Sequence, residues 1–144
     1  MLFRSDSSGL CVFTTFAWTL NDIQPQIAAA CEGDAFNGSD VQADVFVKMG
    51  LHLGFGGTLT YERSRQIRRL AARLPLESIV IETDAPDIPP SWLSAGEANY
   101  SYHLPRIAQV LAQVRGISEV DLSVALWRNT LNAMPRLHAI LPEV

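Results

Sequence analysis

Two carboxylates lie close together near the middle of the chain, in the segment Glu82-Thr83-Asp84. Alternate side chains of a strand point to the same side of a sheet, so we expect Glu82 and Asp84 to point one way and Thr83 the other. Two carboxylates this close either bind a cation or raise each other's pKa. A structural alternative is that Glu82 hydrogen-bonds loop backbone and Asp84 caps the turn before Pro86. The spacing alone leaves both interpretations open.

The segments on either side of these carboxylates indicate where they lie in the fold. Residues 78–81, Ser-Ile-Val-Ile, form a continuous apolar and β-branched run, which is typical of a strand buried on both faces of a parallel sheet. Residues 85–90, Ala-Pro-Asp-Ile-Pro-Pro, cannot extend that strand or begin a long helix, because each proline fixes its own φ and restricts the residue before it. We therefore expect the carboxylates at the carboxyl end of an interior parallel strand, where α/β folds place their chemistry.

From Asp34 onward, helix-like and strand-like segments alternate with short connections, which predicts the α/β class. A second strand is expected over residues 51–55, where the glycines at 54, 56 and 57 leave room for a ligand or a backbone turn. Helices are predicted where apolar residues recur at helical spacing between capping residues. The expected helices run from a cap at Ser39 or Asp40 to Gly50, with Val41, Val45 and Met49 on one face; over 62–74, with a solvated arginine face; over 104–115, closed by Gly116; and from Ser118 to a frayed end marked by Asn129, Asn132 and Pro135.

Composition indicates a globular protein with one domain. The 144 residues are 48% hydrophobic and 18% charged, and the formal net charge is −4, so the chain as a whole repels a polyanion unless a basic patch or a metal ion intervenes. Cys11 and Cys31 lack metal-site spacing and are expected to be reduced thiols. No apolar run approaches the roughly 20 residues of a membrane span, and the N-terminus is a poor signal peptide, so we expect a cytoplasmic protein without membrane contact.

Several strings, in order along the chain, resemble the TatD-like family of metal-dependent hydrolases and deoxyribonucleases. Residues 81–86, Ile-Glu-Thr-Asp-Ala-Pro, resemble the E-T-D-x-P segment that ends the eighth strand of that family's (β/α)8 barrel. The resemblance covers about residues 35–140. Its other strings are Phe36-Asn37-Gly38-Ser39, Leu53-Gly54-Phe55-Gly56-Gly57, Pro75-Leu76-Glu77-Ser78, Arg115-Gly116-Ile117-Ser118 and Asn129-Thr130-Leu131-Asn132.

The resemblance implies a TIM-barrel enzyme that holds divalent metal ions, Mg, Zn or Mn, at the carboxyl ends of its strands. It implies hydrolysis of phosphodiesters in DNA, typically from the 3′ end, with a metal lowering the pKa of a bound water. Asp84 corresponds to the family aspartate that belongs to the metal site and orients or deprotonates the water, so Asp84 is the expected metal ligand and catalytic residue. Glu82 would lie behind it and not bind the metal.

The chain also departs from the family pattern. It has no H-x-H motif, and Asp34 stands where the family has a histidine. Of its three histidines, His52 is expected at the strand end away from the chemistry, His138 in solvent, and His103 in a loop that could reach the barrel mouth. Residues 1–33 have no assignment. One hypothesis is a fragment, or a frame change near codon 34, with residues 34–144 as the C-terminal part of the barrel; a genuine short paralogue is the alternative and needs more assumptions.

A whole barrel needs about 250 residues, so this chain can supply only the last two to three βα units and the closing helices. The sequence therefore leaves open whether the chain is itself an enzyme. One interpretation is a metal-dependent deoxyribonuclease with little or no activity in this truncated form. Another is a non-catalytic remnant or interaction module that binds a partner or its own copy through exposed strand edges. A third keeps the barrel but changes the substrate to an ester or amide.

The loop that follows the carboxylates carries three aromatic residues. Trp92, Tyr100 and Tyr102 could stack on nucleobases at the barrel mouth. The alternative is that these rings simply cover the loop.

Overall fold

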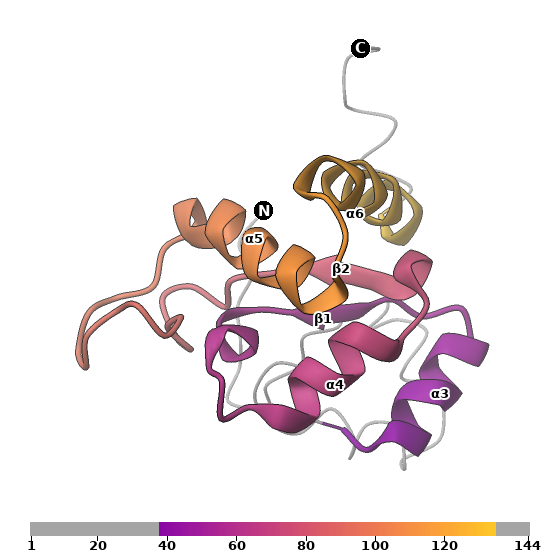
Figure 1. The fold of residues 1–144 in the computed structure, drawn as a ribbon, viewed down its shortest axis with the longest axis horizontal. Coiled ribbons are helices and arrows are strands. Elements are labelled where there is room, and N and C mark those ends of the chain that lie inside the picture. The colour runs from indigo at the N-terminus through magenta and orange to yellow at the C-terminus, as the bar shows by residue number, and fades with distance from the viewer. Residues whose placement is uncertain (1–37, 135–144) are drawn as a thin grey trace.

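The computed structural model describes residues 38–134, which form an α/β arrangement (Figure 1). The predictions for residues 1–33, including Cys11 and Cys31, and those for Asp34 and His138 lie outside this range. Within it, no helix is long and apolar enough to cross a membrane.

Two parallel strands form the sheet in the described part of the chain. β1 spans Leu53–Phe55 and β2 spans Ile79–Ile81, with Leu53 opposite Ile79 and Phe55 opposite Ile81. Both lie inside the predicted strand segments. A strand needs a neighbour on each side to be interior, and the described residues supply one neighbour for β2. The two strands end at the same edge, so whatever follows Phe55 lies beside whatever follows Ile81.

The helix α3, Asp40–Lys48, begins as the sequence predicts. Ser39 is its N-cap: the Ser39 hydroxyl accepts a hydrogen bond from the backbone N–H of Gln42, and the Gln42 side-chain oxygen accepts one from the backbone N–H of Ser39. The predicted apolar face is wrong. Ala43 and Phe46 are the buried residues, whereas the expected face is exposed; its residues are Val41, Val45 and Met49. Both faces have helical spacing, and packing against β1 selects the one that carries Phe46.

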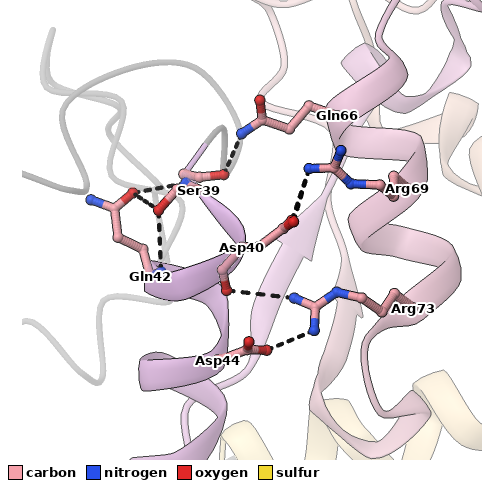
Figure 2. A network of polar contacts seen from close by, with 8 residues as sticks. Ser39, Asp40, Gln42, Asp44, Gln66, Arg69 and Arg73 are labelled. Atoms are coloured by element: carbon pink, nitrogen blue, oxygen red, sulfur yellow. Dashed lines mark hydrogen bonds and ion pairs between the residues drawn. The ribbon is translucent and has the colours of Figure 1, made fainter.

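The helix α4, Arg65–Arg73, begins three residues later than predicted, after Ser64. Its buried residues include the expected Ile67, Leu70 and Ala71. The arginine face is exposed, but it also contacts α3 (Figure 2). Arg69 lies 3.0 Å from the Asp40 carboxylate, and Arg73 lies 2.8 Å from Asp44. Because these pairs are exposed, each contributes about 0–1 kcal/mol to the contact between α3 and α4.

The last two helices follow the predicted boundaries closely. α5 spans Leu104–Arg115 and ends at Gly116, whose φ of 65° is the left-handed conformation of a C-cap. α6 spans Glu119–Ala133, and its N-cap Ser118 accepts a hydrogen bond from the backbone N–H of Asp121. Three short 3₁₀ turns connect the elements: η1 over Gly57–Thr60, η2 over Leu76–Ser78 and η3 over Ser101–His103.

The predicted fraying at Asn129 is wrong. Asn129 lies inside α6, is 2% exposed, and donates through Nδ2 to the carbonyls of Leu76 and Ile79, at 2.7 Å each. A buried amide thus joins the last helix to the start of β2.

One hydrophobic core joins these elements. α4 packs against α5, α5 against α6, and α6 against β2. Each large apolar side chain buried there contributes about 1.5–3 kcal/mol. Its members include Phe46, Leu53, Phe55, Leu70, Ile79, Leu111 and Leu122. The connection between β2 and α5 extends to one side of this body (Figure 1).

Candidate metal centre

Asp84 lies just past the carboxyl end of β2. The last ladder bond runs from the backbone N–H of Glu82 to the carbonyl of Phe55, at 3.2 Å, and the chain then leaves the sheet. Asp84 has a φ of 52°, in the left-handed region, and the peptide bond between Ala85 and Pro86 is cis. The predicted strand alternation therefore stops before Asp84. Aspartate is among the few non-glycine residues that enter this region readily.

The carboxylates of Glu82 and Asp84 nevertheless lie on one side, over Gly54 in β1 and Gly56 just after it. A Cβ atom on Gly54 would lie 2.7 Å from the carboxylate carbon and oxygens of Glu82. A Cβ on Gly56 would lie 3.3 Å from Cγ of Glu82 and 3.5 Å from Oδ2 of Asp84. One oxygen of each carboxylate is buried. The glycines predicted to leave room for a ligand thus leave room for these side chains.

The loop after Asp84 packs back across the end of β1. A Cβ on Gly57 would lie 3.0 Å from the backbone nitrogen of Pro90 and closer still to the carbonyl oxygen of Ile88. Thr60 fixes the next step, because its hydroxyl accepts a hydrogen bond from the backbone N–H of Ser91, at 2.7 Å. These contacts hold residues 88–91 against η1.

Asn99 holds the same loop from the other side, a role that sequence analysis missed. It is 1% exposed, and its Nδ2 donates to the carbonyls of Thr83, Asp87 and Ile88, with Asp87 at 2.9 Å and Ile88 at 3.3 Å. Its backbone N–H donates to the carbonyl of Pro86, at 3.0 Å. Only the NH₂ end of an amide can donate, which fixes its orientation. Asparagine is common in loops, so no local signal distinguishes this one.

The two described histidines do not join the carboxylates. His52 directly precedes β1, at the strand end opposite Asp84, as predicted, and burial lowers the pKa of its imidazole. His103 lies in η3, where its Nδ1 accepts a hydrogen bond from Nε1 of Trp92, at 3.3 Å.

The donor set is suitable for a metal but incomplete. Carboxylate oxygens are hard ligands that suit Mg²⁺, Mn²⁺ or Ca²⁺, and the space over Gly56 is one that a Cβ would fill. Among residues 38–134, however, no group of three His, Cys, Asp or Glu side chains could hold a metal ion. The described residues therefore supply only part of a metal site.

Comparison with known proteins assigns the family. The family model described as TatD related DNase matches residues 27–134. This chain belongs to the TatD family. It is 40% identical over 95 residues to an uncharacterized metal-dependent hydrolase, YjjV, of Escherichia coli; the match covers 66% of this chain and 36% of that protein. The crystal structure of that homologue has a TM-score of 0.64 at 39% identity, covering 68% of this chain and 38% of that chain.

Some TatD relatives are named as nucleases. Human deoxyribonuclease TATDN3 is 31% identical over 125 residues, which cover 87% of this chain and 44% of that protein. The 3′-5′ ssDNA/RNA exonuclease TatD of Citrobacter rodentium is 34% identical over 98 residues, covering 65% of this chain and 37% of that protein. The chain thus spans less than half the length of these relatives.

Proposed function

We propose that this chain carries the Asp84 part of a TatD-type, metal-dependent phosphodiesterase that hydrolyses DNA from the 3′ end. The observation that carries the proposal is the placement of Asp84 and Glu82 together over Gly56, at the carboxyl end of two parallel strands. Family membership supports it, because relatives are named metal-dependent hydrolases and deoxyribonucleases.

In this proposal Asp84 is a metal ligand and Glu82 supports it. A divalent metal at this place would lower the pKa of a bound water and offset phosphate charge. The residues of this chain bring a carboxylate to the strand edge and hold its loop in place. The remaining donors come from outside residues 38–134. The barrel fold and the truncation, with residues 34–144 as its C-terminal part, belong to the same proposal.

A metal titration of the full chain tests the role of Asp84. Mn²⁺ binding is followed by electron paramagnetic resonance for the wild type, Asp84→Asn and Asp87→Asn. Asp87 is the matched control, because it is an exposed carboxylate in the same loop. Because the described donor set is incomplete, we expect weak but saturable binding that Asp84→Asn abolishes and Asp87→Asn leaves unchanged. Equal binding by all three proteins would refute the assignment.

Substrate choice is tested separately, with 3′-labelled single-stranded DNA and with p-nitrophenyl acetate. Shortening of the DNA that depends on Mn²⁺ and on Asp84 supports the nuclease. Ester hydrolysis without DNA cleavage would transfer the site to the ester or amide class.

A second candidate function is a non-catalytic module that associates with its own copy. Two exposed apolar stripes favour it: Val41 and Val45 on α3 are 72% and 43% exposed, and Val120 and Val124 on α6 are 73% and 55% exposed. Exposed apolar patches of this kind can mark an interaction surface. Sedimentation at increasing concentration tests this candidate, with Val124→Glu as the disrupting change. A monomer at every concentration would exclude it.

A further inference from the structure

The loop that leads into α5 carries a cluster of rings, here called the tyrosine platform and defined as the exposed Tyr100 and Tyr102 with the partly buried His103. The rings of Tyr100 and Tyr102 are nearly parallel, with centroids 5.3 Å apart and an interplanar angle of 11°. The ring of His103 lies 4.4 Å from that of Tyr102. Tyr100 is 52% exposed and Tyr102 is 71% exposed. Such a stack presents flat aromatic area to solvent in a preset orientation.

The platform has a firm base. Nε1 of Trp92 donates to Nδ1 of His103, at 3.3 Å, and the guanidinium carbon of Arg106 lies 4.2 Å above the centre of the Trp92 ring. His103 and Trp92 are less exposed than the tyrosines, and η3, which contains Tyr102 and His103, packs against α5. Arg106 also brings one positive charge beside the Trp92 ring, in a chain whose formal net charge is −4.

The platform is also tied to the loop of Asp84. Tyr100 follows Asn99 directly, so their Cα atoms are about 3.8 Å apart. The Asn99 side chain donates to the carbonyl of Thr83, the residue before Asp84, and its backbone N–H donates to the carbonyl of Pro86. The first ring of the platform therefore begins one residue from a buried amide that holds the candidate metal loop.

Flat, solvent-exposed tyrosines are suited to unpaired nucleobases. Every base has a π-face that stacks on an aromatic ring, and in a duplex those faces are already covered by neighbouring bases. With a net charge of −4, attraction for phosphates is weak, so stacking has to supply most of the affinity.

We propose that Tyr100 and Tyr102 form a nucleobase-binding site that holds single-stranded nucleic acid beside Asp84. This inference deepens the proposed function and rests on it for the chemistry, since the site would deliver a strand to the proposed metal centre. Base recognition itself needs no metal, so the two proposals can fail separately.

The test is fluorescence anisotropy of a labelled ten-residue oligothymidylate titrated with the full chain in EDTA. Tyr100→Ala and Tyr102→Ala are compared with Tyr100→Phe and Tyr102→Phe, which keep the ring. Each alanine change should weaken binding about 5- to 100-fold, whereas the phenylalanine changes should leave it within about twofold. Both residues are exposed, so the variants should fold, and circular dichroism checks this.

A second probe separates stacking from charge. An oligonucleotide of the same length with abasic sites keeps the phosphates but lacks the bases, and the wild type should bind it as weakly as the alanine variants bind the normal strand. Equal binding of the abasic and normal strands would overturn the proposal. So would tyrosine variants with wild-type affinity, or self-association that Tyr102→Ala abolishes without any oligonucleotide binding.

The outcomes also distinguish this inference from the proposed function. Asp84→Asn should bind the oligonucleotide in EDTA as tightly as the wild type does. Ring-dependent binding by a protein that neither binds Mn²⁺ nor cleaves DNA would support the site and refute the nuclease. Metal-dependent cleavage whose KM is unchanged by Tyr102→Ala would support the nuclease and overturn the site.

Discussion

Replacing Asn99 should disturb the Asp84 loop without touching either carboxylate directly. The Asn99 amide donates to three backbone carbonyls, those of Thr83, Asp87 and Ile88. In Asn99→Ala these acceptors lose their donor, and each acceptor left buried and unsatisfied costs about 1–3 kcal/mol. Some of them will regain water, because Asp87 is exposed. We therefore expect the free energy of unfolding to fall by about 2–4 kcal/mol.

Asn99→Asp sharpens the same prediction because it preserves shape. The carboxylate would place an acceptor where the structure requires a donor, so it should destabilise the protein at least as much as alanine does at neutral pH. Asp84 has a φ of 52°, and the Asn99 hydrogen bonds on either side of it, which help to maintain this conformation, would be lost. The Mn²⁺ affinity of Asn99→Asp should therefore also fall, although Asn99 itself does not bind the metal in this proposal.

The assay is urea unfolding followed by circular dichroism, together with amide hydrogen exchange of residues 83–90. Asn132→Ala is the matched control, because Asn132 is an exposed asparagine on α6 and its replacement should change stability by less than about 0.5 kcal/mol. The proposed role of Asn99 is refuted if the free energy of unfolding of Asn99→Asp lies within that margin of the wild-type value and amide exchange at Asp87 is unchanged.

Three further predictions concern residues around the same sheet. Gly54→Ala should destabilise the protein by about 1–3 kcal/mol and weaken Mn²⁺ binding, since its Cβ would lie 2.7 Å from the Glu82 carboxylate; unchanged melting and titration curves would contradict this. Asn129→Leu should cost about 2–4 kcal/mol in urea unfolding, because two carbonyls lose their donor, and a neutral effect would count against that bridge. Burial lowers the pKa of His52, so the unfolded chain takes up its proton first; the free energy of unfolding should fall as pH drops below 6.5, the ordinary value, until the lowered folded pKa is passed. His52→Gln should flatten that part of the pH profile, and a profile of unchanged slope would disprove it.

Local chemistry made the helix ends and strand positions predictable. Ser39, Ser118 and Gly116 act at the helix ends where their types place them, because a cap depends on atoms within one turn. The apolar run at 78–81 contains β2 for a similar reason: its side chains suit a buried strand wherever it pairs.

Features that depend on distant segments were not predictable from the sequence. Val41 and Phe46 lie on different faces of α3, and only contact with β1 decides which face is buried. The bonds of Asn99 reach residues 11 to 16 positions away, and those of Asn129 reach residues 50 and 53 positions away, beyond any local pattern. The prediction that strand alternation extends to Asp84 failed because Asp84 takes the left-handed conformation before Pro86.

Contacts among the described residues hold both ends of the Asp84 loop. Gly57 and Thr60 hold the far end of the loop, and Asn99 holds the near end. An incomplete donor set is therefore compatible with a well-placed carboxylate. If further polypeptide supplied the remaining donors, metal binding would not have to order the Asp84 loop, so little conformational entropy would be lost there. Metal affinity should then rise without rearrangement of residues 83–91. Weak Mn²⁺ binding by this chain alone would then reflect missing ligands and not a disordered loop. Amide hydrogen exchange at Asp87 that is the same with and without Mn²⁺ would support missing ligands, whereas slower exchange with Mn²⁺ would indicate that the metal orders the loop.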